Sequence, residues 1–552
     1  MKLAFVDAAG KEIARGEVAG GETIWAAARR LGLPLPLPCG GQGLCGRCRV
    51  EVAPAPPPEA AETACLSVAD LARGVRLACR CRPAEEATVR LLGDGTAAIS
   101  TPAAAGEGYP EWVPAGPGGS GFGVAIDLGT TTLVAGCVDL ATGQVRGLAQ
   151  AANPQSRHGD DLMTRLGYAL TGPAALAELQ RLAREAAGGA TREACARAGV
   201  RPEDLRAAVV AGNPGMQHLF LGLAVERLAR APHQPALRGS LTLPAAAAGL
   251  PLAPEAAVYF PPPAGGFVGG DAVAAAAAEG FFTDSQGAPR LLVDLGTNGE
   301  VLLSAGGRVY ACSTAAGPAF EGGRLSCGVR AQPGAVVALA PGRPWRAQTV
   351  DGAPARGLAG SGALAAAALL VATGALAPSG RLAGPGEAAR LATWPGLAER
   401  LTVLPDGERA AVIVPAGEGE GPAPVLLTQR DIRQLQLAKG AVRAGVETLL
   451  ARAGLAAGDL EEVRLAGAFG QGLSAEVALA TGLLPSVPAA RIKPAGNAAW
   501  RGAARLLADP ALRAPVEAAA REVVHVGLAG DMQFDAAYLH NLDFPPPPEV
   551  VK

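Results

Sequence analysis

Residues 122–143 read FGVAIDLGTTTLVAGCVDLATG: an apolar run, a glycine turn, a second apolar run and another turn. This order is typical of two buried strands joined by a tight turn. Much later, residues 289–307 read PRLLVDLGTNGEVLLSAGG and repeat the design, with Asp294 in the position of Asp127. We therefore predict an internal duplication, with one such strand pair in each half of the chain.

The stretches around the two strand pairs predict helices. Residues 173–197 and 428–453 are rich in Ala, Leu, Arg and Glu at helical spacing. Two small-residue stretches, beginning at Gly266 and Pro494, predict helices that pack closely, as connectors crossing between two halves must, although core packing would explain the same composition. The chain thus predicts an α/β architecture in which two similar lobes face one another.

Each glycine turn carries groups suited to binding a phosphate. Glycine lets the backbone approach a phosphate oxygen, and the following N–H groups and threonine hydroxyls can donate hydrogen bonds to it. The aspartate before the turn can hold Mg²⁺ through water. One such turn is common in hairpins, but two facing copies can grip a triphosphate from opposite sides. The candidate contacts are Asp127, Gly129, Thr130, Thr131, Thr132, Asp294, Gly296, Thr297 and Asn298.

Two later glycine-rich stretches, LAGSG at 358–362 and RLAGAFGQG at 464–472, offer small residues against which adenine and ribose can lie. Taken alone, each stretch is more typical of glycines that serve packing or turns. The candidate contacts are Gly360, Gly362, Gly467 and Gly470.

Asparagine is rare in this chain, with five in total. Four of them lie in Gly-rich or turn-like segments, where a short amide has a specific role or simply serves turn chemistry. These four are Asn153, Asn213, Asn298 and Asn497.

Cysteines cluster near the N-terminus, where six of the ten precede residue 82. The loop PCGGQGLCGRCRVEV has the spacing Cys39-x5-Cys45-x2-Cys48, and RLACRCRP adds Cys79 and Cys81. Four thiolates around a compact two-iron cluster suit this spacing, because backbone N–H groups of a glycine-rich loop can point at the sulfides. Structural zinc usually takes paired CxxC knuckles, and the second pair here would be cramped.

The fourth ligand is open between two residues. Cys79 ends an apolar run, as a ligand at a strand edge would, whereas Cys81 would face the other side if the strand bends. Cys65 is predicted to be a small buried hydrophobe.

The length of 552 residues exceeds one hydrophobic core, at about 100 to 200 residues per domain. We predict a multidomain chain with a small α+β domain at 1–93, a Gly/Pro/Ala-rich linker at 94–120, a first lobe at 121–280 and a second lobe at 281–552. The last residues, FPPPPEVVK from Phe544 onward, are predicted to form an exposed polyproline tail.

Charge and hydropathy exclude several partners. The 48 basic and 50 acidic side chains nearly cancel, so we expect neither nucleic acid nor an anionic membrane as a partner. The mean hydropathy of +0.23 comes mostly from alanine, and the uncharged stretch 357–380 is broken by Pro378, so no membrane span is predicted. We expect no secretory signal at the N-terminus, and therefore a cytoplasmic protein.

The first 93 residues resemble the [2Fe-2S] ferredoxin domain, in the wider-spaced form that occurs fused to enzymes. The resemblance implies a one-electron carrier with Cys39, Cys45, Cys48 and Cys79 as cluster ligands. Arginines flank these thiols, either as a basic rim that docks a reduced ferredoxin or flavodoxin donor, or as ordinary solvated side chains. They are Arg47, Arg49, Arg80 and Arg82.

Residues 121–510 resemble the superfamily of acetate and sugar kinases, Hsp70 chaperones and actin, because phosphate loop, connector, second phosphate loop, adenosine loop and connector recur in that order. The resemblance implies ATP bound between two ribonuclease-H-like lobes that close on it. Hydrolysis then needs a positioned water, with Asp294 as the orienting carboxylate or, with the roles exchanged, Asp127.

Three further segments extend the likeness to nearly the whole chain: NPQSRHGD at 153–160, GNPGMQHL at 212–219 and CSTAAGPAFEGG at 312–323. With the ferredoxin-like domain, they look like the reductive activators of corrinoid proteins. In that family the reduced ferredoxin domain returns the cob(II)amide of a partner corrinoid protein, part of a methyltransferase system, to cob(I)amide while ATP is hydrolysed. The resemblance also allows a homodimer.

Ser313 and Thr314 precede the glycine-flanked turn GPAFEGG. Our hypothesis is that both hydroxyls face the partner's corrinoid, because the ligands and surroundings of a metal tune its potential. The alternative is an ordinary helix cap or turn.

Three other functions fit parts of the pattern. An activator of a radical 2-hydroxyacyl-CoA dehydratase shares the ATP fold but carries a bridging [4Fe-4S] cluster, and the later cysteines here form no CxxC pair. A small-molecule kinase needs a base beside an acceptor hydroxyl. A redox-sensing binding protein would hydrolyse ATP only to change shape.

Overall fold

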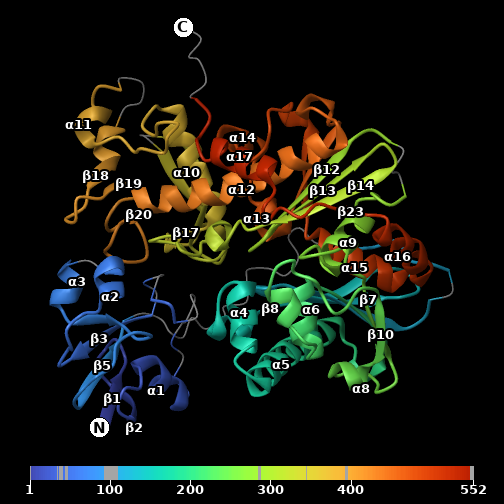
Figure 1. The fold of residues 1–552 in the computed structure, drawn as a ribbon, viewed down its shortest axis with the longest axis horizontal. Coiled ribbons are helices and arrows are strands. Elements are labelled where there is room, and N and C mark those ends of the chain that lie inside the picture. Colours follow the sequence, from blue (N-terminus) through green and yellow to red (C-terminus); the bar gives the residue numbers. More distant parts are fainter. Residues whose placement is uncertain are drawn as a thin grey trace. The chain divides into compact units, whose positions relative to one another are not determined.

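The computed structural model describes residues 2–33, 35, 41–43, 46, 48–66, 68–92, 110–117, 119–283, 287–342, 345–391 and 396–546. The chain divides into two compact units. Figure 1 shows the fold coloured along the sequence, from blue at the N-terminus to red at the C-terminus. Unit 1 combines residues 1–100 with 152–183, and unit 2 combines residues 101–151 with 184–552. Among the described residues, no helix has both the length and the apolar character needed to cross a bilayer.

The N-terminal part of unit 1 is a five-stranded sheet. In sheet order the strands are β2 (Glu12–Glu17), β1 (Lys2–Val6), β5 (Ala87–Leu91), β3 (Arg49–Ala53) and β4 (Val75–Leu77). Helix α1 (Ile24–Arg30) begins at the Thr23 cap and buries Ile24, Ala27 and Ala28 at helical spacing. Two short helices, α2 (Ala60–Cys65) and α3 (Val68–Ala72), lie between β3 and β4 in sequence. This is the predicted α+β arrangement.

The rest of unit 1 comprises η1 (Pro154–His158), α4 (Leu162–Ala169) and the first turns of α5 (Pro173–Ala198). Arg29 of α1 donates to the Tyr168 hydroxyl at 2.9 Å and to Glu178 Oε2 at 2.7 Å. Glu178 also accepts from Tyr168 at 2.7 Å and lies 3.1 Å from Nε2 of the buried His158. These contacts tie α1 to the segment 152–183 within the unit.

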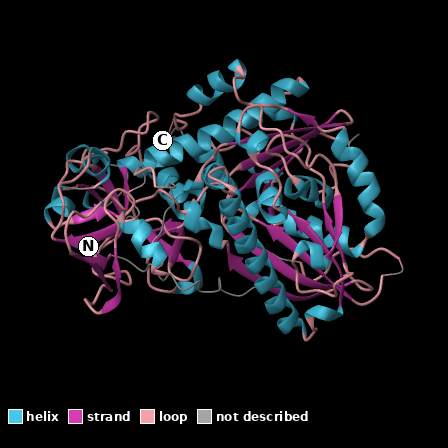
Figure 2. Cartoon of the chain, turned by 60° about the horizontal axis from the view of Figure 1, so that its bottom comes forward, coloured by secondary structure: helices cyan, strands magenta, loops and turns pink. Residues whose placement is uncertain are grey.

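Unit 2 contains two six-stranded sheets with helices packed on them (Figure 2). The first sheet has the order β10 (Leu241–Pro244), β11 (Ala257–Phe260), β9 (Leu205–Ala211), β6 (Phe122–Leu128), β7 (Thr132–Asp139) and β8 (Val145–Ala152). The second has the order β22 (Ile492–Gly496), β21 (Glu462–Ala466), β12 (Arg290–Leu295), β13 (Gly299–Ala305), β14 (Arg308–Thr314) and β23 (Val524–His525).

The two sheets share one topology. In each, the first strand of the DLGT hairpin lies between its antiparallel partner and a parallel strand from later in the sequence: β6 between β7 and β9, and β12 between β13 and β21. Asp127 and Asp294 therefore end equivalent central strands. The shared topology confirms the predicted duplication.

The two halves exchange a helix. Helix α9 (Gly270–Ala278), from the first half, packs alanines on the second sheet, and α15 (Ala498–Ala508), from the second half, packs Trp500 beneath the first sheet. Trp500 is fully buried and donates from Nε1 to the Ala125 carbonyl at 3.1 Å. The helices lie side by side (Figure 1), and a Cβ on Gly502 would lie 1.9 Å from the carbonyl oxygen of Ala274. The predicted close packing of these two helices is confirmed.

The remaining elements of unit 2 surround these sheets. Two three-stranded sheets are formed by β16 (Trp345–Thr349), β15 (Ala335–Pro341) and β17 (Gly357–Leu358), and by β18 (Leu401–Val403), β19 (Arg409–Val414) and β20 (Val425–Thr428). The other helices include α6 (Pro214–Leu221), η3 (Pro318–Glu321), α10 (Gly360–Ala372), α12 (Gln429–Ala453), α13 (Gly467–Gln471), α14 (Ala475–Ala480), α16 (Arg513–Arg521) and α17 (Met532–His540).

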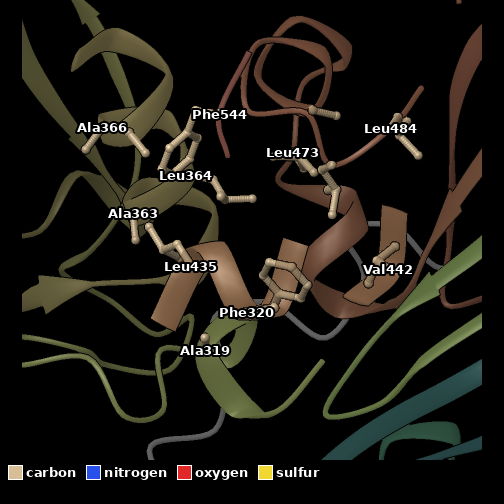
Figure 3. Close-up of a cluster of buried hydrophobic side chains, with 14 of the residues drawn as sticks. Ala319, Phe320, Ala363, Leu364, Ala366, Leu435, Val442, Leu473, Leu484 and Phe544 are labelled. Atoms are coloured by element: carbon tan, nitrogen blue, oxygen red, sulfur yellow. The ribbon is translucent and has the colours of Figure 1, made fainter. Parts of the chain in front are cut away.

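Two stretches differ from their sequence-based interpretation. Residues 110–117, predicted as part of the linker, pack on the first half: Val113 is 1% exposed and bonds the Gly143 carbonyl at 2.8 Å. Phe544, predicted to begin an exposed tail, is 2% exposed and belongs to the apolar cluster of α10 and α12 (Figure 3). In both cases an apolar side chain lies within a Pro/Gly-rich stretch. The free energy gained by burying it outweighs the tendency of such a composition to stay extended and exposed.

Candidate functional site

Two of the predicted cluster ligands lie together at one end of the β3–β4 pair. Cys48 precedes β3 and Cys79 follows β4, both are buried, and the N–H of Ala78 donates to the Cys48 carbonyl at 2.8 Å. Cys39, Cys45 and Arg47 lie outside the described residues. Within the described ranges no three His, Cys, Asp or Glu side chains form a metal-binding group, so the complete ligand set stays a prediction.

Cys81, the other candidate for the fourth ligand, is also buried. Burial, together with the nearby Glu62 carboxylate, raises the pKa of the Cys81 thiol to about 12. The choice between Cys79 and Cys81 stays a prediction. Cys65 is half-buried and its Sγ donates to the Gly43 carbonyl at 3.2 Å, whereas the sequence predicted a fully buried side chain.

The arginines beside the thiols are paired with acids. Arg80 and Arg82 lie 3.2 and 3.5 Å from Glu59, and Arg49 lies 3.4 Å from Asp70. Such exposed pairs are worth only about 0–1 kcal/mol each. Three arginines share two carboxylates, so the predicted basic rim is only partly neutralised.

Four carboxylates in unit 2 lie near enough for their charges to interact, although within the described part of the chain they are not gathered into a group that directly holds a metal ion. Asp127 and Asp294 lie at the ends of β6 and β12, Asp271 is the second residue of α9, and Glu300 lies opposite Asp294 on β13. Glu300 is buried and the other three are partly buried. The charge of Asp271 interacts with those of the other three carboxylates. The result is an acidic centre built from both halves of the duplication.

Burial raises the pKa of each of these carboxyls, and repulsion from neighbouring carboxylates adds to the shift for Asp271, Asp294 and Glu300. The pKa of Asp127 rises to about 6, although the hydrogen bond from Asn497 lowers it. The pKa of Asp294 rises to about 7 and that of Asp271 to about 8, while the pKa of Glu300 lies well above its usual range. A cation that binds the ionised forms would relieve this repulsion.

Two asparagines fix the first hairpin to helix starts. Asn497 caps α15 and donates from Nδ2 to Asp127 Oδ2 at 2.7 Å. Asn213 caps α6 and donates from Nδ2 to Thr130 Oγ1 at 3.1 Å. Both are among the few asparagines that the sequence singled out, but nothing in the sequence indicated that they bond to Asp127 and Thr130.

The two hairpin turns meet through their threonine hydroxyls. Thr131 Oγ1 lies 3.0 Å from Thr297 Oγ1. Both hydroxyls also contact the carboxylate of Glu321, at 2.7 Å from Thr131 and 3.0 Å from Thr297. The predicted phosphate turns therefore face each other, with an acidic side chain between them that the sequence did not assign to the site.

The two turn glycines, Gly129 and Gly296, differ in the free space around their Cα atoms. A Cβ on Gly129 would lie 2.3 Å from the Thr132 carbonyl oxygen, so that turn excludes any side chain. Around Gly296 the nearest atom would be 3.6 Å away, at the Asn298 carbonyl, which leaves the backbone open to approach.

The predicted adenosine glycines are packed against protein backbone. A Cβ on Gly360 or Gly362 would lie 2.0 or 2.1 Å from a carbonyl oxygen, and one on Gly470 would lie 3.0 Å from a backbone carbon. Gly467 has a φ of +87°, and a Cβ there would lie 2.6 Å from Asp294 Oδ1. These glycines serve close packing, and Gly467 also brings the start of α13 beside the acidic centre.

Ser313 and Thr314 end β14, and their surroundings differ. Thr314 is 2% exposed and donates to the Gly299 carbonyl at 3.0 Å, so it offers no surface to a partner. Ser313 is partly exposed and donates to Glu300 Oε1 at 3.4 Å. We keep the hypothesis of a corrinoid-facing hydroxyl for Ser313 alone.

The site residues that the sequence analysis missed are carboxylates brought in from other elements. They are Asp271, Glu300 and Glu321.

Three family models match successive parts of the chain. Residues 7–84 match the 2Fe-2S iron-sulfur cluster binding domain, residues 122–284 the RACo middle region, and residues 288–549 the C-terminal domain of RACo, the ASKHA domain. These matches support an iron–sulfur cluster in the N-terminal domain and ATP binding in the ASKHA domain.

Two relatives and one solved structure are similar over most of their length. Corrinoid activation enzyme RamQ of Eubacterium limosum is 33% identical over 424 residues, which cover 77% of this chain and 70% of that protein. The [Co(II) methylated amine-specific corrinoid protein] reductase of Methanosarcina barkeri is 26% identical over 458 residues, 77% of each chain. The reductive activator for corrinoid, iron-sulfur protein superposes with a TM-score of 0.70 at 26% identity, covering 99% of this chain and 98% of that one. The chain belongs to the family of reductive activators of corrinoid proteins.

Proposed function

We propose that this protein takes one electron from reduced ferredoxin or flavodoxin and passes it through a [2Fe-2S] cluster to the cob(II)amide of a partner corrinoid protein, with ATP hydrolysis driving the transfer. The observation that carries the proposal is the combination, in one chain, of a cysteine-rich N-terminal domain and a duplicated fold with paired DLGT turns. The two relatives, named for corrinoid activation and corrinoid protein reduction, supply the substrate class. None of the three rival functions has such support.

The reaction needs ATP for a physical reason. A potential difference of about 30 mV is worth about 1.4 kcal/mol for a two-electron couple, and half of that for one electron. An uphill step of a few hundred millivolts therefore costs several kcal/mol. Nucleotide hydrolysis coupled to a change of shape can supply that free energy.

The acidic centre is the proposed place of Mg²⁺ and the ATP phosphates. Its oxygen-only donors suit Mg²⁺, which prefers carboxylates and water, and Asp294 is the proposed group that orients the attacking water while Asp127 holds the ion through water, or the reverse. When bound, Mg²⁺ neutralises charge on the phosphates and carboxylates. Asn497 keeps Asp127 in position by its hydrogen bond, and Asp271 adds a third carboxylate beside it.

The proposed cluster ligands are Cys39, Cys45, Cys48 and Cys79. The cluster would supply one-electron transfer. The protein holds Cys48 and Cys79 together by the bond between Ala78 and Cys48, and it shields both sulfurs from water.

The test is reduction of a corrinoid protein of a methyltransferase system by the purified protein under anaerobic conditions. We expect cob(I)amide absorbance to appear only with reductant and ATP together. Asp294→Asn should abolish ATP hydrolysis and ATP-dependent reduction, whereas Asp535→Asn, an exposed aspartate of the same unit, should behave like the wild type. If cob(I)amide forms equally without ATP, the proposal is wrong.

Assembly is tested separately. Light scattering of the purified protein would give a mass of twice the chain if the protein is the proposed homodimer.

A further inference from the structure

Residues 317–323 form a short turn whose position is fixed by the core. It is flanked by Gly317 and Gly322, whose φ angles of +73° and +75° favour glycine. Between them, Phe320 is 1% exposed and stacks on Phe469 of α13 with ring centroids 4.8 Å apart. Figure 3 shows Phe320 inside the apolar cluster. Because Phe320 is anchored, the adjacent Glu321 is held where both hairpin turns can reach it.

Counting protons shows what Glu321 does to the two threonines. An ionised carboxylate only accepts hydrogen bonds, and each hydroxyl has one proton to give. Two protons therefore serve three close pairs: Thr131 with Glu321, Thr297 with Glu321, and Thr131 with Thr297. In every arrangement the protons point at Glu321 or at the other threonine. Neither is directed at a phosphate oxygen.

We propose that Glu321 is a positioning residue that competes with the nucleotide phosphates for the hydroxyls of Thr131 and Thr297. This rests on the proposed ATP site. Without nucleotide, the carboxylate holds the two hairpin turns together. A phosphate takes the same protons and repels the carboxylate, because both are anions.

Displacement of Glu321 can affect the neighbouring strand β14. The turn 317–323 follows β14, whose last residues include the partly exposed Ser313, and its Phe320 packs on α13. Because Phe320 anchors the turn, displacement of the Glu321 carboxylate strains the turn, which is joined to the strand that carries Ser313. In this way the state of the nucleotide is linked to the surface proposed to face the corrinoid.

The test is the affinity of the full chain for a non-hydrolysable ATP analogue with Mg²⁺, measured by calorimetry. Glu321→Gln keeps the shape but removes the charge, so we expect binding about tenfold tighter than in the wild type. Glu321→Asp withdraws the carboxylate by one methylene and should tighten binding less. Glu418→Gln, an exposed glutamate of the same unit, is the matched control and should bind like the wild type.

A double-mutant cycle separates competition from a general charge effect. In a chain carrying Thr131→Val and Thr297→Val the hydroxyls are gone, so Glu321→Gln should no longer change the affinity. An equal gain in both backgrounds would overturn the proposal. Weaker binding by Glu321→Gln would also overturn it, since Glu321 would then be a ligand of the nucleotide or its Mg²⁺. If the wild type itself binds no analogue, the proposed ATP site is wrong, and the role proposed for Glu321, which depends on that site, is wrong as well.

Discussion

Cys79 and Cys81 both follow β4, and both are buried. Cys79 comes directly after Ala78, whose N–H donates to the Cys48 carbonyl. This backbone contact places Cys79 next to another predicted ligand, and we therefore propose Cys79 as the fourth ligand.

The first prediction separates these two cysteines. Cys79→Ser should lose the iron–sulfur cluster, while Cys81→Ala should retain it, because Cys79 is the proposed fourth ligand. Iron content and the paramagnetic spectrum of the reduced protein measure the outcome. Loss of the cluster in Cys81→Ala with retention in Cys79→Ser would reverse the assignment.

The second prediction concerns the pH dependence of the nucleotide-free protein. The carboxyls of the acidic centre have folded-state pKa values of about 6 to 8, above about 4 in an unfolded chain. Between those values the folded state binds more protons than the unfolded state, so stability falls as pH rises from 4 to 8. The slope is at most about 1.4 kcal/mol per pH unit for each titrating group.

Thermal unfolding at pH 6 and pH 8 measures this effect. We expect a lower midpoint at pH 8 without divalent cations, and a smaller difference with Mg²⁺, which binds the ionised carboxylates. Asp271→Asn should flatten the dependence because it removes one charge from the centre, while Asp535→Asn should not. A midpoint that rises between pH 6 and pH 8 without Mg²⁺ would contradict the shifts.

At the scale of secondary-structure elements, the contact of α9 with α15 depends on a glycine. A Cβ on Gly502 would lie 1.9 Å from the Ala274 carbonyl oxygen, and backbone cannot yield as a flexible side chain can. The two helices are therefore close enough that one added methyl group must separate them.

The third prediction follows from that contact. Gly502→Ala should lower the free energy of unfolding by about 1–3 kcal/mol, the usual cost of overpacking. The control is Gly189→Ala in α5, where no atom lies within 4 Å of the new methyl group and alanine should stabilise the helix by about 0.5–1 kcal/mol. Denaturant unfolding measures both. Equal effects at the two positions would show that α9 moves away freely.

Elements with local signals could be predicted from the sequence. The hairpins at Asp127 and Asp294 could be predicted because the apolar runs and the glycine turn of each hairpin follow one another directly in the sequence. The exchange of α9 and α15 could not be predicted, because small-residue helices do not encode which sheet they cover.

The same limit applies to the candidate site. Asp271 reaches the acidic centre, and Glu321 reaches Thr131 and Thr297, only through the tertiary fold, so neighbouring residues do not indicate these contacts. Thr314 was predicted to face a partner because a hydroxyl near a glycine-flanked turn suggests exposure, but its pairing on β14 buries it.

At the scale of the whole molecule, unit 1 joins segments that are far apart in sequence. Arg29 contacts both Tyr168 and Glu178, and its guanidinium also lies 5.6 Å from the centre of the Tyr168 ring. The N-terminal domain is thus tied to residues 152–183 by one small polar network.

The fourth prediction tests this network in the whole chain. Arg29→Ala should raise amide hydrogen exchange in 154–169, because it removes the contacts from α1, while the free energy of unfolding should change by no more than about 1 kcal/mol for so exposed a pair. Arg15→Ala removes a pair within β2 and should leave exchange in 154–169 unchanged. Unchanged exchange in both variants would show that the network does not hold this segment.

The exchange of helices between the halves also bears on biosynthesis. The strands β6, β7 and β9 leave the ribosome early, but the helix that carries Trp500 beneath them is translated much later. Until residues 498–508 emerge, the nascent chain has no native cover for that apolar surface, and it is open to aggregation during translation. A truncated product that stops before residue 498 should therefore accumulate as insoluble material.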